Sequence, residues 1–364
     1  MRVNTTSINL VDFVSVSNYR ELSSFYSQKK VTVTGGASFI GSHLVDQLLI
    51  LGAKVTVLDD LSSGKLSNLQ ANENLEFVKV DLADRNFAFQ HIGKGNVLFH
   101  LAAIHGGRGF IETYQKLMLT NLAIDNNVFN AAVSQEFEMV VHASSACAYP
   151  LKNQSSSTDL KYLAEDMSEI GEGVESSADG VYGWTKLIGE YQLKTLSSDK
   201  TRGRSARIFT AYGERENESH AAIALIAKGL LKIDPYPIWG TGDQTRNFTY
   251  VADTVLGLLF LGADSRAEAF DAVNVGTSKH NTVLEFIEKI FSKTGWTPSK
   301  IDKQLDKPMG VASRASDNTK IRQLFGWEPE TEIEVGISRT LDWYQALSDR
   351  PQNEKELNSR LNSR

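Results

Sequence analysis

Tyr182 and Lys186 lie four residues apart in the segment VYGWTK, which is the spacing of neighbours on one helix face. An ammonium group beside a phenol favours the phenolate, so this spacing is expected to lower the pKa of the tyrosine. Such a tyrosine can take the proton of an alcohol while a hydride leaves the same carbon. The pair alone is a common pattern, and its meaning depends on what else the chain places near it.

A second group of reactive side chains lies in HASSACAYP, residues 142–150, which contains Cys147, the only cysteine among 364 residues. The segment continues an apolar stretch typical of a strand, so Ser144, Ser145 and Cys147 fall at or just after its carboxyl end. Open α/β sheets bind their ligands at this end. A lone cysteine is usually a small buried residue. Cys147 is therefore either part of the wall of a site or a group that moves a proton there.

A glycine-rich turn indicates where a dinucleotide binds. TGGASFIG places Gly35, Gly36 and Gly41 between a strand and a helix, and glycines let the backbone approach a pyrophosphate at the helix N-terminus. Asp59 ends the next strand, where a carboxylate accepts hydrogen bonds from a ribose diol and repels a 2′-phosphate. We therefore expect NAD rather than NADP. Asp81 ends a further strand and either contacts the adenine or caps a helix.

The elements around these residues alternate along the chain. KKVTVTGGASFIGSHLVDQLLILGAKVTVLDD has the pattern of strand, turn, helix and strand, and later segments repeat it. Strands that alternate with helices predict a Rossmann-type, doubly wound parallel α/β sheet. We expect a partly ordered N-terminal arm at 1–28 and an NAD-binding domain at 29–205 with contributions from later segments. A smaller mixed α/β substrate subdomain at 206–349 and a frayed polar tail at 350–364 would follow.

The composition argues against several classes of protein. A net charge of −6 gives no reason to expect nucleic acid or an anionic membrane as a partner. The chain has no run of about 18 apolar residues that would predict a membrane span. One cysteine cannot form an internal disulfide, which fits a reducing, cytoplasmic location. The seven histidines are not at metal-ligand spacing, so no metal site is expected.

Six segments together resemble the extended short-chain dehydrogenase/reductases that act on nucleotide sugars. They are TGGASFIGSH, VLDDLSSGK, FHLAA, HASSACAYP, VYGWTK and TRNFTYVADT, and the resemblance runs from about residue 30 to residue 344. It implies that Tyr182 is the catalytic base and that Lys186 is its partner and a ligand of the nicotinamide ribose. It also implies that Ser144 or Ser145 places a hydroxyl beside C4 of the sugar.

The same resemblance implies a tightly bound NAD that is recycled in each turnover. Its expected contacts are Gly35, Ser38, Phe39, Ile40, Asp59, Asp81, Leu82, Leu101, Ala102, Ala103, Tyr182 and Lys186. Helices of the type expected around 115–134 and 181–196 form a dimer interface in this family, which implies a homodimer.

Three segments, GGRGFIE, ASSACAYP and GVASRASDNTKIRQLFGWEP, resemble those of one branch of the family, the GDP-mannose 3,5-epimerases. This likeness implies a catalytic role for Cys147. The substrate contacts that it implies are Gly106, Gly107, Arg108, Thr210, Arg246 and Arg314. The branch pairs its cysteine with a lysine, where this chain has His220, which is either a general acid or base or an ordinary surface residue. Thr210 stands where the family usually has asparagine.

The expected reaction begins with oxidation of the sugar at C4. The ketone acidifies the C–H bonds at C3 and C5, Cys147 and His220 exchange a proton there, and the cofactor then reduces C4 again. The alternatives are a 4-epimerase, which needs only serine, tyrosine, lysine and NAD, and a 4-oxidase. A 4,6-dehydratase is less favoured, because those enzymes carry Asp-Glu where this chain has Ala146-Cys147. A non-catalytic NAD sensor or scaffold would have no need for this set of reactive residues.

Overall fold

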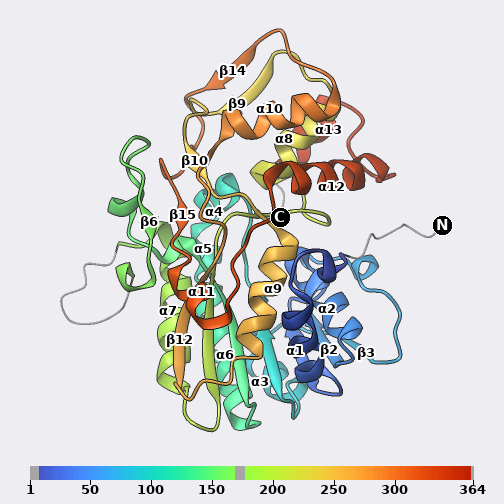
Figure 1. Ribbon diagram of the computed structural model, residues 1–364, viewed down its shortest axis with the longest axis vertical. Coiled ribbons are helices and arrows are strands. Elements are labelled where there is room, and N and C mark those ends of the chain that lie inside the picture. The colour runs from blue at the N-terminus through green and yellow to red at the C-terminus, as the bar shows by residue number, and fades with distance from the viewer. Residues whose placement is uncertain (1–7, 169–176, 362–364) are drawn as a thin grey trace.

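A seven-stranded parallel sheet forms the centre of the protein in the computed structural model, which describes residues 8–168 and 177–361 (Figure 1). From one edge to the other the strands are β12 (Phe270–Val275), β7 (Arg202–Ile208), β5 (Met139–Ser145), β4 (Val97–His100), β1 (Lys30–Thr34), β2 (Lys54–Asp59) and β3 (Leu75–Lys79). The chain starts in the middle at β1 and winds outward to both edges. The predicted Rossmann-type α/β fold is thereby confirmed.

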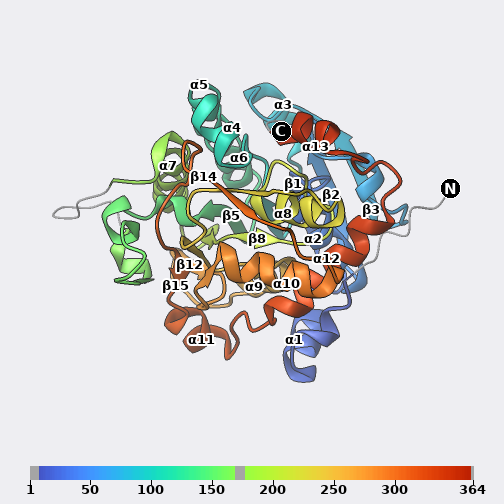
Figure 2. The same cartoon turned by 90° about the horizontal axis from the view of Figure 1, so that it is seen from above.

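Helices cover both faces of the sheet (Figure 2). One layer contains α1 (Val16–Tyr26), α2 (Phe39–Ile50), α9 (Val251–Gly262) and α11 (Thr319–Phe325), and the other contains α3 (Arg85–His91), α6 (Thr120–Ser134) and α7 (Gly180–Leu196). Strand side chains alternate between the two layers. Val33 and Val57 belong to the apolar core under α2 and α9, whereas Leu58, Leu98 and Val140 belong to the core under α3 and α6.

The second half of the chain builds a smaller group of elements at one end of the sheet (Figure 1). They are α8 (Ala221–Leu230), β9 (Tyr236–Trp239), α10 (Val283–Thr294), β14 (Ile301–Gln304), α12 (Ile333–Ala346) and α13 (Glu354–Arg360). Helix α10 begins with a capping box, in which Thr282 and Glu285 each bond the backbone N–H of the other. Two-stranded ladders are β8 (Ala211–Tyr212) with β11 (Thr249–Tyr250), β10 (Thr245–Arg246) with β13 (Asn281–Thr282), β6 (Tyr162–Leu163) with β15 (Ala315–Ser316), and β9 with β14.

Short helices fill the connections between these elements. They are η1 (Leu10–Asp12), η2 (Leu66–Asn68), α4 (Arg108–Thr113), α5 (Gln115–Met118), η3 (Ala146–Ala148), η4 (Leu151–Gln154) and η5 (Glu165–Met167).

The main sheet takes its last strand from the second half of the chain. Strand β12 pairs with β7 along its whole length, and all twelve residues of α9 are buried against the sheet and α2. The expected domain limit between residues 205 and 206 falls within β7. Segments beyond this limit contribute one strand, β12, and one covering helix, α9, to the main sheet. The domain limits themselves stay predictions.

Both chain ends pack on the core where the structure describes them. Ile8 and Leu10 are buried, and the hydroxyl of Tyr26 on α1 donates to the carbonyl of Leu259, 2.7 Å away. In the C-terminal segment, Leu357 of α13 is fully buried. The expectation of a partly ordered arm and a frayed tail is therefore wrong for residues 8–28 and 350–361. A few buried apolar side chains, such as Leu22 and Leu357, anchor these segments, which a reading of overall polarity misses.

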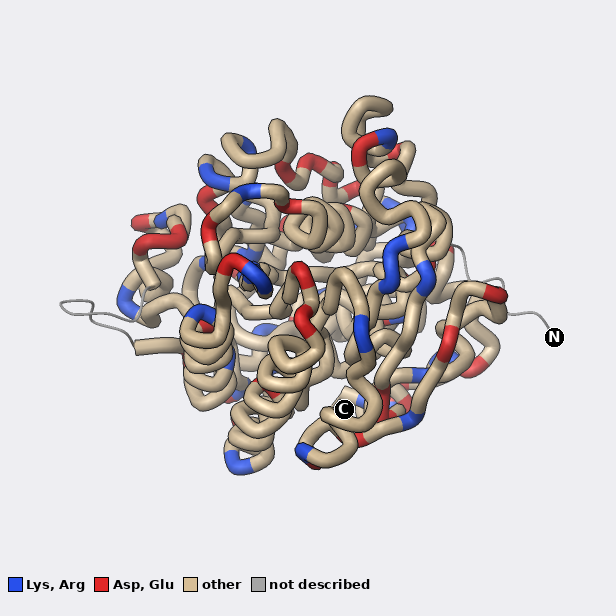
Figure 3. Tube along the Cα trace, turned by 90° about the horizontal axis from the view of Figure 1, so that it is seen from below, with Lys and Arg blue, Asp and Glu red and all other residues tan. Residues whose placement is uncertain are grey.

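Acidic and basic positions are interspersed over the molecule seen from below (Figure 3). Among the helices in the described ranges, none combines the length and the apolar character that a membrane span requires.

His43 of α2 links the NAD-binding half to the loop before α8. Its ring is fully buried and Nε2 donates to the carbonyl of Glu214, 2.9 Å away. Burial, aided by the positive charge of Arg215, lowers the pKa of His43 to about 3. An unfolded chain protonates this histidine below about pH 6.5, whereas the folded chain does not. The contribution of His43 to the free energy of unfolding therefore falls as the pH drops from about 6.5 toward about 3.

We expect His43→Gln, which keeps a donor for Glu214, to lose less stability than the wild type between about pH 7 and about pH 5. One proton per molecule corresponds to about 1.4 kcal/mol per pH unit, so the difference should reach about 2 kcal/mol. Urea denaturation at the two pH values measures it. His91→Gln, at a partly exposed position of α3, is the control and should keep the wild-type pH dependence. An identical loss in His43→Gln and the wild type would contradict the assignment.

Candidate active site

A cavity of about 270 Å³ lies against the glycine-rich turn after β1. A Cβ atom at Gly35 would lie 2.7 Å from the backbone nitrogen of Ala102, and one at Gly41 would lie 2.2 Å from the carbonyl oxygen of Gly35. Gly35 also has a φ of +70°, which favours glycine. The turn therefore brings bare backbone to the wall of the cavity, as binding of a dinucleotide pyrophosphate requires.

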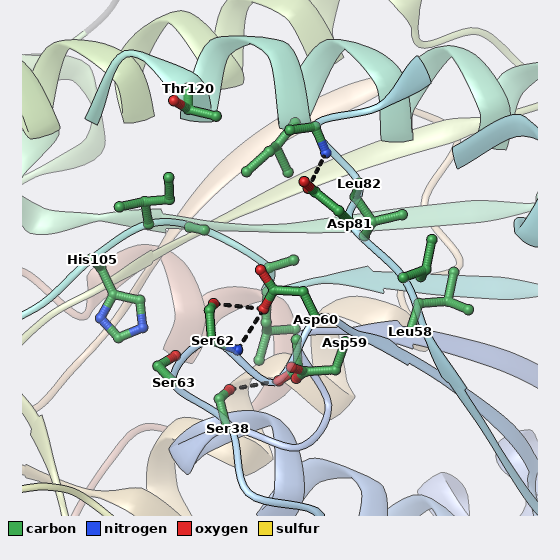
Figure 4. Close-up of a pocket in the computed structure, with 18 of the residues that line it drawn as sticks. Ser38, Leu58, Asp59, Asp60, Ser62, Ser63, Asp81, Leu82, His105 and Thr120 are labelled. Atoms are coloured by element: carbon green, nitrogen blue, oxygen red, sulfur yellow. Dashed lines mark hydrogen bonds between the residues drawn. The ribbon is translucent and has the colours of Figure 1, made fainter. Parts of the chain in front are cut away.

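The carboxylate of Asp59 is held at the end of β2. Its oxygens accept the backbone N–H groups of Ala37, 3.0 Å away, and Leu61, 2.8 Å away. Asp59 and Asp60 lie on one side of the cavity and Asp81 on another (Figure 4). An acidic group at this place fits the ribose diol of NAD, and the residues present therefore fit this cofactor.

Most of the residues expected to bind the cofactor line this cavity. They are Gly35, Ser38, Asp59, Asp81, Leu82, Leu101, Ala102 and Ala103. Phe39 and Ile40 form the first turn of α2, next to the wall but not among the lining residues. Asp81 does not cap a helix, because Asp84 caps α3. Its carboxylate instead accepts the N–H of Ala83, 2.9 Å away, at the edge of the cavity.

A second cavity, of about 330 Å³, lies between the carboxyl ends of β5 and β7 and the elements of the second half. Nine residues that sequence reasoning selected for catalysis or substrate binding line it, namely Gly106, Gly107, Arg108, Ser145, Cys147, Thr210, His220, Arg246 and Arg314. The structure thus brings together segments that lie more than two hundred residues apart in the chain.

Ser145 and Cys147 are positioned by one tight turn. The hydroxyl of Ser145 accepts the backbone N–H of Cys147, 3.1 Å away, and so caps the single turn of η3. The carbonyl of Cys147 in turn accepts the N–H of Asp179, just before α7. A Cβ at Gly183 would lie 2.2 Å from that carbonyl. The glycine after Tyr182 is therefore what allows α7 to pack directly on the cysteine turn.

Ser144 points away from the cavity. Its hydroxyl donates to Glu190 of α7 and is buried, because neighbouring residues of a strand face opposite sides of the sheet. Arg207 holds the same carboxylate, with Nη2 2.8 Å from Oε2. The expectation that Ser144 faces the sugar is wrong, and Ser145 is the serine that lines the cavity.

Tyr182 lies next to Ser145 and Cys147 rather than in the lining of either cavity. Lys186 is buried one turn further along α7, with Nζ 5.9 Å from the centroid of the tyrosine ring. Burial raises the pKa of Tyr182, the charges of Cys147 and Asp125 raise it further, and a hydrogen bond with Ser145 acts in the opposite direction. Lys186 is not among these influences, so the expected lowering of this pKa by Lys186 is wrong.

Asp125 of α6 forms a buried cluster beneath Lys186. One carboxylate oxygen lies 3.0 Å from Nε2 of His100, and the other lies 3.8 Å from Nε2 of His142. Burial raises the pKa of Asp125, but the hydrogen bond from His100 and the charges of His142 and Lys186 outweigh it, so the pKa lies below its ordinary value. Burial lowers the pKa of Lys186, and the charges of Asp125 and Glu190 oppose this. An ionised Asp125 is thus a counter-ion for the lysine.

Three arginines surround the inner part of the substrate cavity. Arg314 donates to the sulfur of Cys147 at 3.4 Å and to Asp179 at 3.0 Å, and Arg108 donates to Asp179 at 2.8 Å. Arg246 instead reaches two backbone carbonyls. Burial, together with the charges of the other two arginines, lowers the pKa of Arg246. This excess of positive charge favours an anion in the cavity.

Sequence reasoning missed Asp179, Asp125, His105, Glu216 and Lys228. Asp179 binds two of the arginines, Asp125 faces Lys186, and Lys228 lines the substrate cavity. Burial lowers the pKa of Lys228 to about 8. Glu216 lies four residues before His220, and His105 and Asp179 adjoin segments that the sequence had already indicated. Asp125 and Lys228 come from segments that only the fold brings to the site.

Comparisons with known proteins agree with this geometry. The model of the NAD dependent epimerase/dehydratase family matches residues 31–276. The UDP-N-acetyl-alpha-D-glucosaminuronate decarboxylase of Bacillus cytotoxicus is 26% identical over 338 residues, with 88% of this chain and 99% of the relative covered. The GDP-mannose 3,5-epimerase of Arabidopsis thaliana is 28% identical over 324 residues, with 86% of this chain and 81% of the relative covered.

A solved structure has the same architecture. The epimerase Mth375 of Methanothermobacter thermautotrophicus superposes with a TM-score of 0.78 and is 29% identical, with 91% of this chain and 96% of that chain covered. The family model spans more than half of the chain and includes both the glycine-rich turn and the segment with Tyr182 and Lys186. The chain therefore belongs to the NAD-dependent epimerase/dehydratase family.

Proposed function

We propose that the protein is a nucleotide-sugar epimerase, an isomerase that works through a transient 4-keto sugar, with GDP-mannose as the first substrate to test. The observation that carries this proposal is one cavity lined by Ser145, Cys147 and His220, with Tyr182 packed beside the cysteine turn. The cavity thus offers groups for the alcohol at C4 and two further groups that can carry protons. The likeness to GDP-mannose 3,5-epimerases, at 28% identity for one of them, supports the choice of substrate.

The proposed residues act at two places on the sugar, which are C4 and a carbon next to C4. As the phenolate, Tyr182, which lies beside Ser145 and is backed by Lys186, receives the proton of the C4 hydroxyl. When bound, NAD supplies the reversible oxidation of this alcohol to a ketone. The ketone makes the hydrogens on the neighbouring carbons acidic, and Cys147 and His220 remove and return a proton there. Because the cofactor is restored in each turnover, no net oxidation of the sugar is expected.

The arginines would hold the diphosphate of the substrate. Arg246 and Arg108 both lie close to Gly310, where a Cβ would lie 3.3 Å from Nη2 of Arg246 and 3.6 Å from Cδ of Arg108. Guanidinium groups fit phosphate oxygens in geometry and charge. Among the described residues Arg246 hydrogen-bonds backbone carbonyls and pairs with no carboxylate, so we assign it the closest role toward the diphosphate.

We expect Arg246→Ala to weaken binding of a nucleoside diphosphate about 10- to 100-fold, the value of one charged hydrogen-bonded contact. Isothermal titration with GDP and with UDP measures this loss. Arg322→Ala is the matched control, because that guanidinium is more than half exposed on α11 and pairs with Glu328 outside the cavity. Equal affinities of Arg246→Ala and the wild type would remove Arg246 from the site.

One reaction in D2O tests the proposed function. The protein is incubated with a panel of nucleotide sugars that begins with GDP-mannose, and the products are examined by NMR. Deuterium at C3 or C5 together with inversion supports the proposal. Inversion at C4 without deuterium would overturn it in favour of a 4-epimerase, and accumulation of a keto sugar would indicate a 4-oxidase.

The 4-epimerase is the second candidate, and one contact favours it. Arg314 donates to the sulfur of Cys147 while Asp179 and Gln154 hold the same guanidinium. In a 4-epimerase this contact would make Cys147 a fixed part of the cavity wall, with no proton to move. The D2O experiment separates the two candidates, because only the first exchanges carbon-bound hydrogen.

We also propose a homodimer and a cytoplasmic location. Large apolar side chains are exposed on the segment of α4 to α6 and on α7, namely Tyr114, Leu117, Leu119, Trp184 and Tyr191. Burial of this surface against a second copy would remove it from water. Light scattering coupled to gel filtration tests the dimer. A reducing cytoplasm would keep the thiol of Cys147 free for proton transfer.

A further inference from the structure

Glu216 and His220 form a carboxylate–imidazole pair at the N-terminus of α8. Oε1 of Glu216 lies 2.9 Å from Nδ1 of His220. The side chain of Glu216 is 2% exposed, whereas that of His220 is 26% exposed and lines the substrate cavity. The second oxygen of Glu216 is buried and has no hydrogen-bond partner among the described residues. The carboxylate of the pair therefore lies inside the protein, whereas the imidazole ring faces the substrate cavity.

The loop that carries the pair is fixed from several directions. Arg215 bonds Asp46 of α2 at 2.7 Å, next to the bond from His43 to the carbonyl of Glu214. On the other side, Gly107 packs on the carbonyl of Ser219, because a Cβ at residue 107 would lie 1.8 Å from that oxygen. These contacts hold the carboxylate of Glu216 in place. The imidazole ring of His220 must therefore take the orientation that its contact with this carboxylate requires.

His105 completes the surroundings of His220. The two rings meet edge to face, with centroids 5.8 Å apart. His105 lines the cofactor cavity (Figure 4), whereas His220 lines the substrate cavity. His220 thus lies where the two cavities adjoin, which is also where the sugar meets the cofactor in a reaction at C4.

A carboxylate that accepts Nδ1–H selects one form of the imidazole. The hydrogen bond places the proton of the neutral ring on Nδ1 and leaves Nε2 as the atom that exchanges protons. Burial raises the pKa of Glu216, and the charge of His220 and its hydrogen bond oppose this. His220 is also the N-cap residue of the ten-residue helix α8, which fixes its backbone at the start of that helix.

We propose that Glu216 is the positioning residue of His220, which it turns so that Nε2 faces the sugar in the cavity shared with Cys147. The inference rests on the proposed function. In one turnover the thiolate of Cys147 takes a proton from the carbon next to the ketone, and the electron pair delocalises into the ketone as an enolate. The imidazolium of His220 then gives its Nε2 proton to that carbon and becomes neutral. Solvent restores both groups by removing the proton from sulfur and adding one to Nε2.

The experiment compares Glu216→Gln with Glu214→Gln. Glu214 lies on the same loop, is equally buried, and accepts a hydrogen bond from Tyr250 instead of from a histidine. We expect Glu216→Gln to slow deuterium uptake from D2O into the sugar about 100-fold, the order of effect for misorienting a catalytic histidine. The appearance of reduced nicotinamide in a single turnover should stay within about threefold of the wild type, because oxidation at C4 uses Tyr182. Glu214→Gln should change neither rate by more than about threefold.

A second measurement needs no substrate. In the full-length protein labelled with ¹⁵N-histidine, the resonances of His220 are assigned with His220→Gln, and their shifts report which nitrogen carries the proton. We expect the Nδ1–H form in the wild type and in Glu214→Gln, and a mixture of forms in Glu216→Gln. An Nε2–H form in the wild type would overturn the proposal, as would unchanged deuterium uptake in a folded Glu216→Gln. If Glu216→Gln does not fold, the wild-type spectrum alone shows whether Nδ1 of His220 carries the proton. If no nucleotide sugar reacts, the proposed function fails, and the same spectrum still shows whether Glu216 sets the protonated nitrogen of His220.

Discussion

Tyr182→Phe should lose turnover by about 10³-fold while NAD stays bound. The substitution removes the only group that we assign to the C4 hydroxyl proton, and general acid–base catalysis contributes about 10²- to 10⁴-fold. The ring itself is kept, so its packing beside Lys186 and the cysteine turn is retained. Steady-state rates with the substrate found in the D2O experiment measure the loss, and the absorbance of the purified protein reports its nucleotide content.

Tyr191→Phe is the control for this experiment. Tyr191 lies on the same helix, α7, but its side chain is about half exposed and does not line the substrate cavity. We expect the rate of this variant to stay within about twofold of the wild type. Wild-type turnover in Tyr182→Phe would contradict the assigned proton acceptor. Loss of NAD from Tyr182→Phe would point to a binding role in its place.

Substitution of Cys147 should separate the two halves of the reaction. We expect Cys147→Ser to form reduced nicotinamide from the substrate at a rate close to that of the wild type. Deuterium uptake at C3 and C5 should fall by about 10²- to 10⁴-fold, because a serine hydroxyl is a far weaker acid than a thiol and is not ionised near neutral pH. Serine keeps an oxygen that can accept the hydrogen bond of Arg314, so the shape and charge of the cavity change little.

Cys147→Ala also removes the thiol, and it leaves no side-chain atom at this position that could accept the hydrogen bond of Arg314. The guanidinium keeps its bonds to Gln154 and Asp179, so we expect the protein to fold and the uptake of deuterium to fall as in Cys147→Ser. NMR in D2O and single-turnover absorbance are the measurements for both variants. Deuterium uptake at the wild-type rate in either one would make Cys147 a wall residue.

The sequence was sufficient to predict the cavity proposed for the cofactor, because its elements are local. Gly35 and Asp59 lie within thirty residues of one another and both line this cavity. The adjacent serines were harder to assign. The pattern Ser144-Ser145 does not say which side chain faces the ligand until the register of β5 fixes the alternation.

The sequence did not reveal which charged groups surround the residues of the candidate site. Asp179 pairs with Arg108 and with Arg314, which lie 71 and 135 residues away in the chain. The pKa of Tyr182 likewise depends on its burial and on the charges of Cys147 and of Asp125 from another helix. The ends of the chain were misjudged for a related reason. A single fully buried leucine, Leu357, anchors α13 in a segment whose average composition is polar.

The position of β12 in the main sheet has a consequence for how the protein is made. Because β12 and α9 lie beyond residue 250, the edge of β7 stays unpaired and the face under α9 stays uncovered until most of the chain has left the ribosome. Contacts of such long sequence separation form late and slow folding. A fragment that ends near residue 205 would expose both the unpaired strand edge and the apolar face, which promotes aggregation. The NAD-binding half is therefore not a unit that can be excised, and experiments on the cofactor site require the complete chain.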